Sequence, residues 1–519
     1  MKTLIAALSA TTLLSPAAMA DQLTRVVTIP VGGEITGMFM HGDDLFFNIQ
    51  HPADDLPNAF AKATVGVIAN ADFGAGASTF PETDADKQTV VSSLGAYQIL
   101  VQEGDFGKIG HITGKNGEIK VSNDPDFNAF VATGAREGYL FTNWEDRPGG
   151  MSRVKLSRAE DGTWSANGDD AMMIDFSGIG GTWVNCFGTL SPWNTPLTSE
   201  ELYFDETADW NDKGYKYISD VEALASYKGE YPNPYDYGYI VEITDPTGSA
   251  TPQKHYALGR FSHENSVVMP DMRTAYMSDD GTDVVFYKFV ADRAGDLSSG
   301  TLYAAKMKQL AEPGAPASDA AFQISWIELG HGNDAEIERW IRSYDGITQD
   351  DHVEGKTSYI SDDEVAAWAR GDAADNRVAF LESRKAAAAK GATAEFRKME
   401  GVNINLEGAR TGAVPYMYMA MSEVAKGMAD TEGDIQVGEN RCGVVYEMKL
   451  DANFNVHKMV PVVAGGPYDG NNEANACATD NIANPDNILV RDNGDVLIGE
   501  DTGAHENNAM WLWTRSASM

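Results

Sequence analysis

Acidic side chains recur at the ends of strand-like segments along this sequence. They are Glu145, Glu201, Glu264, Asp279, Asp280, Glu400, Asp486, Glu500 and Asp501, followed in one case by Asn487. Each residue alone is more often a turn cap or a solvated acid than a metal ligand. If the segments bring their ends to one mouth, however, the side-chain oxygens would suit a hard cation such as Ca²⁺.

The chain contains three cysteines, Cys186, Cys442 and Cys477. In an oxidising compartment cysteines normally pair, and three cannot all pair within one chain. Cys442 and Cys477 lie in the same C-terminal region, so a disulfide between them is the natural bridge. Cys186 is then either a small buried apolar side chain or a thiol with a chemical role. A thiolate among the carboxylates would select a softer cation, and iron is the candidate.

Several common catalytic motifs are absent from the sequence. It has no Gly-x-Ser-x-Gly nucleophile elbow, no His-Glu-x-x-His zinc helix and no complete phosphate-binding loop. Nine histidines are too few to suggest a histidine-rich metal site. The remaining candidates for chemistry are therefore the carboxylates and the odd thiol.

The first 20 residues have the pattern of a secretory signal peptide. Lys2 supplies a positive charge, residues 4–14 form a short apolar run, and Ala-Met-Ala precedes Asp21. The apolar run is too short to span a bilayer, and no later stretch is long and apolar enough to do so. We therefore expect Sec-type export to the periplasm or the medium and no membrane association.

The chain is strongly acidic, with a formal net charge of −38 at pH 7 over 519 residues. This charge argues against nucleic acids and anionic membranes as partners. Most of the acidity is consistent with a solvated surface, but an acidic protein that handles an anionic substrate would need cations. The hydrophobic fraction of 43% can supply a large core, and we expect a monomer.

The elements that must position these residues are mostly short strands. Segments rich in β-branched and aromatic residues lie at 44–52, 138–146, 201–206, 237–244, 283–292, 300–307, 415–424, 443–452 and 487–501. Asn-Gly or Asp-Gly pairs at 116–117, 161–162, 280–281 and 493–494 supply hairpin turns. Strands spread this evenly predict an all-β propeller rather than two sandwiches. We expect residues 21–519 to form one domain.

Residues 335–391 break the strand pattern and predict a helical insertion over one face of the β body. Within it, Ser361 and Glu364 form a capping box, and Gly371 marks the end of that helix. The stretch 376–390 follows as a further helix, with lysines in its last turns and Gly391 after it.

The order of several motifs resembles that of the PhoX family of alkaline phosphatases. The most specific is the Cys-to-Glu segment CFGTLSPWNTPLTSEE at 186–201, with its Pro-Trp pair. The others, in order, are His263-Glu264, Tyr276 to Asp280, Tyr287 to Val290, Gly300 to Ala304, Gly391 to Glu400, and Pro485 to Asn487. The resemblance runs from about residue 128 to near the C-terminus.

This resemblance implies a six-bladed propeller with an iron and calcium cluster that hydrolyses phosphate monoesters outside the cytoplasm. Carried over by position, Cys186 and Glu201 would bind Fe³⁺, and Glu264 would bridge or flank the cluster. The residues that would bind Ca²⁺ are Asp280 or Asp279, Glu400 and Asp486, with Asn487 as a further candidate. An oxygen held by the cations would attack phosphorus in line, so no protein nucleophile would be needed.

The resemblance also implies a cationic contact to the phosphate. Family members typically place an arginine two positions before the glutamate that corresponds to Glu400. Here that position is Lys398, with Arg397 beside it. Lysine keeps the charge but loses the bidentate fork, so substrate preference or affinity would differ.

Three further features depart from the family pattern. Trp144 stands where the family has a histidine in the segment 141–154. The stretch 47–52 resembles a segment that family members carry near the C-terminus, which leaves the first blade unassigned. The N-terminus lacks the twin arginines of the family's export signal, so the metals would be loaded after export.

Two other classes of protein remain open from the sequence. One is a calcium-dependent propeller of the lactonase or arylesterase kind, which has no need for Cys186. The other is a non-enzymatic extracellular binding propeller. Within the phosphatase interpretation, phosphate monoesters and diesters are not separated by the sequence.

Overall fold

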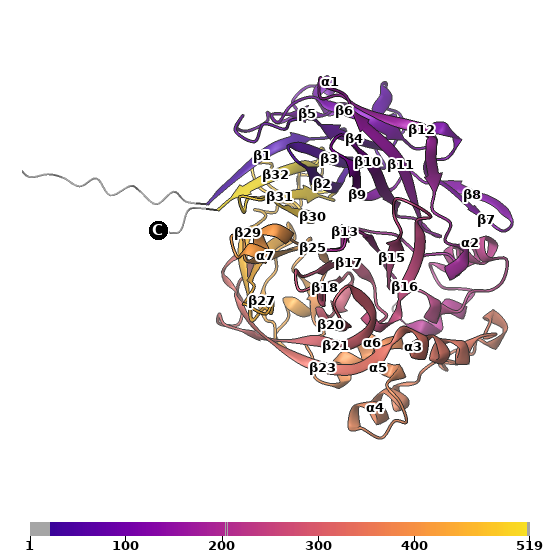
Figure 1. Ribbon diagram of the computed structural model, residues 1–519. Coiled ribbons are helices and arrows are strands. Elements are labelled where there is room, and N and C mark those ends of the chain that lie inside the picture. Colours follow the sequence, from indigo (N-terminus) through magenta and orange to yellow (C-terminus); the bar gives the residue numbers. More distant parts are fainter. Residues whose placement is uncertain (1–20, 203, 205, 516–519) are drawn as a thin grey trace, which may run out of the picture.

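The computed structural model describes residues 21–202, 204 and 206–515, and its body is built mainly of β-strands (Figure 1). The predicted signal peptide, residues 1–20, lies outside the described residues. Within the described part of the chain, every helix is too short or too polar to cross a membrane. The predicted all-β body is confirmed.

Three antiparallel sheets have four strands each. The first contains β2 (Glu34–His41), β3 (Asp44–Gln50), β4 (Thr64–Ile68) and β6 (Tyr97–Gln102). The second contains β9 (Pro125–Gly134), β10 (Glu137–Trp144), β11 (Gly150–Arg158) and β12 (Trp164–Met173). The third contains β13 (Gly188–Leu190), β14 (Pro196–Ser199), β15 (Ile240–Thr244) and β16 (Thr251–His255). In each sheet the strands lie in chain order, and neighbouring strands pair antiparallel.

A nine-stranded sheet divides into a unit of five strands and a unit of four. One half contains β17 (His263–Val268), β18 (Thr274–Asp279), β20 (Tyr287–Arg293), β21 (Asp296–Gln309) and β23 (Phe322–Asn333). The other half contains β25 (Met399–Ile404), β26 (Tyr416–Met421), β28 (Val444–Lys449) and β29 (Lys458–Ala464). The two halves join where Phe322 and Gln323 on β23 pair with Met459 and Lys458 on β29.

The last sheet joins the two ends of the described chain. It contains β30 (Pro485–Val490), β31 (Val496–Glu500) and β32 (Ala509–Thr514), followed by β1 (Gln22–Thr28) and β5 (Val91–Ser92). β1 pairs antiparallel with β32 from Gln22 opposite Thr514 to Thr28 opposite Ala509. In Figure 1 the indigo β1 accordingly lies beside the yellow β32.

The first strands of these units form a ring around the centre of the molecule. β2 contacts β9, and the contacts continue through β13, β17, β25 and β30 back to β2. Figure 1 shows the same strands gathered around the centre. Side chains at the starts of these strands therefore converge at one end of the ring, although they are far apart in the sequence.

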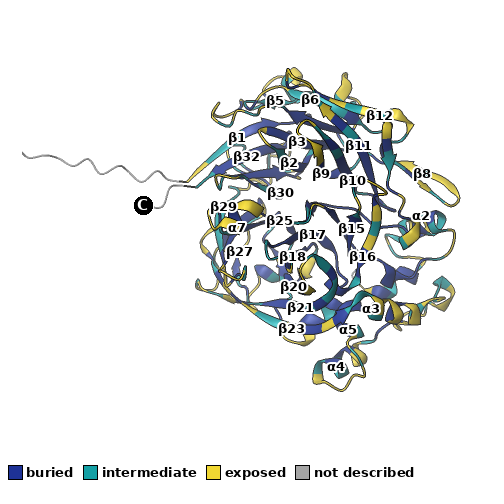
Figure 2. Ribbon diagram, viewed as in Figure 1, coloured by how far each residue is buried: buried dark blue, intermediate teal, exposed yellow. Residues whose placement is uncertain are grey.

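The inner strands are buried on both faces. All six residues of β17 and all six of β18 are buried, and Figure 2 shows the central strands in dark blue. Apolar side chains from neighbouring sheets fill the space between them, as where Phe46 and Val65 pack with Phe130 and Trp164. The burial includes polar side chains, since the first four residues of β17, His263 to Ser266, are all polar and buried.

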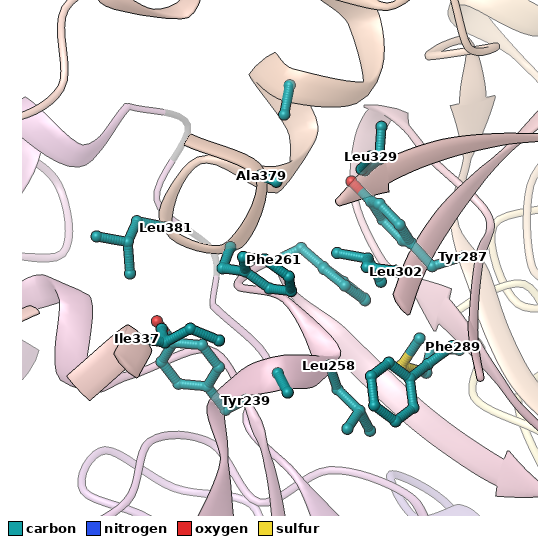
Figure 3. Packing of buried hydrophobic residues seen from close by; sticks show 14 of the residues in the cluster. Tyr239, Leu258, Phe261, Tyr287, Phe289, Leu302, Leu329, Ile337, Ala379 and Leu381 are labelled. Atoms are coloured by element: carbon teal, nitrogen blue, oxygen red, sulfur yellow. The ribbon is translucent and has the colours of Figure 1, made fainter. Parts of the chain in front are cut away.

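The predicted helical insertion is present as α3 (Asp334–Ile341), α4 (Asp362–Arg370), α5 (Arg377–Leu381) and α6 (Ser383–Ala389). The Ser361–Glu364 capping box forms, and Gly371 ends α4 with φ +86°. In Figure 3, Ala379 and Leu381 from the insertion lie beside Phe261. These three side chains belong to one buried apolar cluster, which fixes the insertion to the sheet.

Two local expectations were wrong, and one helix was not expected. No strand forms among the described residues of 201–206; β14 ends at Ser199, and the Glu201 carboxylate lies near Cys186 and Glu264. The helix expected over 376–390 breaks at Glu382, whose φ of −131° separates α5 from α6. A helix not expected from the sequence, α2 (Ile218–Lys228), buries Val221, Leu224 and Tyr227.

The shorter elements complete the body. They are α1 (Asp84–Lys87), α7 (Leu406–Thr411), β7 (His111–Gly114), β8 (Gly117–Val121), β19 (Thr282–Val284), β22 (Ala315–Pro316), β24 (Phe396–Arg397) and β27 (Val437–Gly438). Cys442 and Cys477 form a disulfide across a sequence separation of 35, and Cys186 is free and buried. The odd cysteine is thus the one in the Cys-to-Glu segment.

Candidate metal centre

Strand starts and strand ends bring acidic side chains together at the ring. Asp126, Glu264, Glu400 and Asp486 lie at or near the first residues of β9, β17, β25 and β30. Glu145 follows β10, Cys186 precedes β13, and Glu201 follows β14. The ring places the starts of the first strands at one end, and the antiparallel pairing of β10 with β9 and of β14 with β13 returns the ends of β10 and β14 to that same end.

These side chains form three overlapping groups, in each of which the candidate ligand atoms lie within 4.8 Å of one another. The groups are Asp126, Glu145 and Cys186, then Cys186, Glu201 and Glu264, and then Glu264, Glu400 and Asp486. Cys186 and Glu264 connect the groups, and the Cys186 Sγ atom lies 3.0 Å from Glu264 Oε2. The result is one continuous cluster of carboxylates around a thiol.

Burial and mutual repulsion disfavour the charged forms of these acids. Burial, followed by the charges of Asp486 and Glu400, raises the pKa of Glu264 well above its usual value. Burial and the charge of Glu145 raise the pKa of Asp126 well above its usual value. Burial and the charge of Asp280 raise the pKa of Glu201 in the same way. Among the described residues, Glu264 Oε1 and Asp126 Oδ2 are buried without a hydrogen-bond partner. Such a donor set fits cations, which would supply the missing charge and partners.

The thiol fits the same interpretation. Cys186 is 7% exposed, and burial together with Glu264 and Glu145 raises the pKa of its thiol well above the usual value. A cation bound beside Cys186 would favour the thiolate, because a bound cation deprotonates a thiol ligand.

Lys398 lies at the edge of the cluster. Its Nζ atom donates to Asp280 Oδ2 at 2.8 Å and lies 3.2 Å from Glu400 Oε1. Burial acts to lower the pKa of Lys398, but Asp280 and Glu400 raise it well above the usual value. The ammonium group therefore stays charged, and its side chain is 33% exposed, so it can still meet a ligand.

The other predicted site residues have partners of their own. Arg397 donates to Glu423 at 2.8 Å and to Thr282 at 2.6 Å, and neither partner belongs to the cluster. Asp279 accepts both donors of the Arg384 fork, with Nε to Oδ2 at 2.9 Å. Asn487 Oδ1 accepts the Gly37 N–H at 2.8 Å, and its amide nitrogen lies 3.4 Å from both Asp126 and Asp486. Asn487 therefore touches the cluster through its nitrogen, while its oxygen is already engaged.

Asp126 is the cluster residue that the sequence reasoning missed. It follows Pro125 at the start of β9, and Asp486 follows Pro485 at the start of β30. The repeated Pro-Asp pair before a buried strand was the signal that could have identified it. Glu145 was noted as a strand-end acid, but its place beside Cys186 depends on the ring.

Trp144 does not belong to the cluster. Its indole N–H donates to Ser152 Oγ at 3.0 Å, and the ring is buried with Val65 and Val101. Of its neighbours, Glu145 belongs to the cluster, and Asn143 donates to the backbone carbonyl oxygen of Cys186. Side chains alternate along a strand, so tryptophan in place of histidine changes the core and leaves the cluster intact.

Fold and cluster together define the class of protein, an all-β protein whose buried acidic centre is suited to cations. The family model for alkaline phosphatase PhoX matches residues 100–518. The chain therefore belongs to the PhoX alkaline phosphatase family, a family of metal-dependent phosphatases.

A solved structure of a PhoX protein supports the fold. Pseudomonas fluorescens PhoX, in complex with vanadate as a transition state analogue, is similar with a TM-score of 0.56 and 18% identity. The match covers 96% of this chain and 88% of that one. A GH43 β-xylosidase/α-arabinofuranosidase from a compost microbial metagenome matches with a TM-score of 0.26 and 10% identity, over 61% and 97% of the two chains. That score is too low to support an argument, and no curated protein matches the chain.

The cluster predicts an unusual pH dependence for the metal-free protein. Burial raises the pKa of both Glu145 and Glu400 from 4.5 to about 7. The folded chain keeps protons that the unfolded chain has already lost, so the free energy of unfolding should fall as pH rises from about 4.5 to about 7. Unfolding of chelator-treated protein across this interval would measure the effect. Protein reloaded with cations should lose this trend because the cations replace the protons. Chelated protein that becomes more stable across the interval would contradict the prediction.

Proposed function

We propose that this chain is an exported alkaline phosphatase that hydrolyses phosphate monoesters with the help of bound Ca²⁺ and Fe³⁺. The observation that carries the proposal is the buried cluster of carboxylates around Cys186, with the charged Lys398 at its edge. Membership of the PhoX family supports the same activity. The N-terminal pattern of residues 1–20 supports export, and we propose a monomer.

We propose that the body is a six-bladed β-propeller. The ring of β2, β9, β13, β17, β25 and β30 supports this, because each of these strands begins one unit of four or five antiparallel strands. Pairing of β1 with β32 would then close the last blade with strands from both ends of the described chain. The helical insertion would cover the blade that begins with β17.

The ligand assignment follows the contacts of the cluster. Cys186, Glu201 and Glu264 form the group that contains both a soft thiolate and hard oxygens, which suits iron. Asp126 and Glu145 share the thiol and extend this group. Glu264, Glu400 and Asp486 form an all-carboxylate group, which suits calcium. Asp280 would join them from the side of Lys398.

The chain's own residues would bind and orient the ester. The Lys398 ammonium would contact a phosphoryl oxygen, while Asp280 and Glu400 hold its Nζ atom in place. When bound, the cations would offset the charge of the dianionic ester and acidify a water molecule. Asn143 would keep the Cys186 backbone in place by donating to its carbonyl oxygen.

Replacement of Lys398 tests the phosphate contact. Lys398→Met should raise the KM for a phosphate monoester, and weaken inhibition by inorganic phosphate, by about 10- to 100-fold, because a hydrogen bond to a charged group is lost. Lys398→Arg should retain or tighten phosphate binding, since arginine keeps the charge and adds a fork.

The wild-type assay decides between the classes of function. Metal-loaded protein should hydrolyse phosphate monoesters, and diesters and lactones serve as comparison substrates. Hydrolysis of lactones without phosphate esters would favour the lactonase class. No turnover of any ester by protein that retains its metals would favour a binding propeller.

A further inference from the structure

The break between α5 and α6 is fixed by contacts with the body. Glu382 Oε1 accepts hydrogen bonds from Thr207 Oγ1 at 2.7 Å and from the Tyr235 hydroxyl at 2.8 Å. Ser383 Oγ accepts the Arg260 N–H at 3.0 Å and donates to the Ala379 carbonyl at 2.8 Å. Two consecutive residues of the insertion are thus anchored, and they set the direction in which α6 begins.

The next residue, Arg384, reaches from the insertion to the end of β18. Its Nε atom donates to both Asp279 carboxylate oxygens, at 3.1 and 2.9 Å. Its Nη2 atom donates to Asp279 Oδ1 and, at 2.8 Å, to the Asp280 carbonyl oxygen. The guanidinium group therefore holds both the side chain of Asp279 and the backbone of Asp280.

The ion pair is closed off from solvent on the Asp279 side. Asp279 is fully buried, and its carboxylate also accepts the Ser262 N–H at 3.2 Å and the Val285 N–H at 3.3 Å. Phe261 and Tyr287 stack on one another with ring centroids 4.0 Å apart and belong to the buried cluster shown in Figure 3. A carboxylate in this position needs a permanent partner, because an unpaired buried charge is strongly unfavourable.

The contacts continue from Asp280 to the phosphate-binding lysine. Asp280 Oδ2 accepts a hydrogen bond from the Lys398 ammonium group, with Nζ at 2.8 Å. A backbone hydrogen bond joins the same two segments, since the backbone N–H of Lys398 donates to the Gly281 carbonyl oxygen at 2.8 Å. Lys398 itself has a φ of +52°, a conformation that costs energy for a non-glycine residue and needs support from its surroundings.

We propose that Arg384 is a positioning residue of the phosphate site, acting through Asp279 and Asp280 on Lys398. The helical insertion thereby becomes part of the active centre, since the Arg384 side chain determines the position of the Lys398 ammonium group. Asp279 serves in this arrangement as the anchor for Arg384, and Asp280 is the residue that turns toward the cluster. The proposal rests on the proposed phosphatase function.

Substitutions of Arg384 test the proposal on metal-loaded enzyme. Arg384→Met should raise the KM for a phosphate monoester and weaken inhibition by inorganic phosphate, each by about tenfold, because Asp280 is no longer held against Lys398. Arg384→Lys should recover little of this loss, since a single ammonium group cannot replace the fork. A role in stability alone would lower the amount of active enzyme, and hence the apparent kcat, without changing KM.

Arg377→Met is the matched control. Arg377 lies on α5 of the same insertion, is 33% exposed against 25% for Arg384, and pairs with Asp375 at 2.8 Å. The hydrogen bonds of its side chain to Asp375 do not reach β18. Its loss should therefore leave KM and phosphate inhibition unchanged. Iron and calcium contents of all variants show whether the cluster itself has been lost.

A double variant keeps the test decisive if Arg384→Met does not fold. Arg384→Met with Asp279→Asn removes the buried unpaired charge and should restore folding, while KM stays raised. A folded double variant, or a folded Arg384→Met, with wild-type KM and wild-type phosphate inhibition would overturn the proposal. Failure of the proposed function is a separate result, because wild-type enzyme would then hydrolyse no phosphate ester at all.

Discussion

Replacing Cys186 with serine should remove iron from the protein and abolish phosphatase activity. Cys186 is shared by the group that contains Asp126 and Glu145 and by the group that contains Glu201 and Glu264. Its loss would therefore separate the two groups. A hydroxyl is a harder ligand and resists deprotonation more than a thiol does. We expect activity to fall by more than about 100-fold, beyond the 10- to 100-fold typical of residues that only support a ligand. Elemental analysis of purified protein, together with monoester hydrolysis, would measure both losses.

The double variant Cys442→Ser/Cys477→Ser is the control for sulfur chemistry in general. It removes the disulfide but leaves the thiol in place, so the iron content of the folded protein should stay unchanged. Equal iron content in wild type and Cys186→Ser would contradict the assignment. If both wild type and Cys186→Ser contain calcium in equal amounts and no iron, the lactonase class or the binding propeller would be favoured instead.

Replacing Glu264 with glutamine should have opposite effects on the loaded and the metal-free protein. Glu264 belongs to the iron group and to the calcium group, so glutamine should weaken both and lower activity by more than about 100-fold. In the metal-free protein, burial and the charges of Asp486 and Glu400 make ionisation of Glu264 unfavourable, and glutamine has no charged form. The metal-free form should therefore become more stable at neutral pH, where the glutamate of the unfolded chain is ionised.

Unfolding of Glu264→Gln and wild type, with and without chelator, would measure both effects: the variant should be less stable than wild type with metals and more stable without them. Glu447→Gln is a matched control, since Glu447 is also buried but contacts Tyr418 and Arg515 rather than the cluster. It should leave metal content and activity near those of the wild type. A Glu264→Gln variant that is less stable than wild type in both conditions would mean that this carboxylate is structural.

The sequence by itself determined most of the local structure. Hairpin pairs and β-branched runs predicted the strands, because turn geometry and strand propensity depend on neighbouring residues. The capping box at Ser361 and Glu364 and the glycine at 371 are equally local, and both appear as expected. The spacing from Cys186 to Glu201 is a feature of one continuous segment, so it points to the family without any tertiary contact.

Tertiary structure alone decided which acids meet. Asp126 and Asp486 share a cluster although 360 residues separate them, because the ring places the starts of β9 and β30 at the same end. The sequence could not separate Asp279 from Asp280 either. One of them meets Arg384 from the insertion and the other meets Lys398.

The same limit explains the errors at the level of elements. The helix over 376–390 has good local propensity, yet it breaks at Glu382, where Thr207 and Tyr235 hold the carboxylate. Residues 201–206 have strand propensity, yet Glu201 leaves β14 and turns into the acidic cluster. In each case contacts between distant segments outweigh a local preference of a few tenths of a kcal/mol to about 1 kcal/mol per residue.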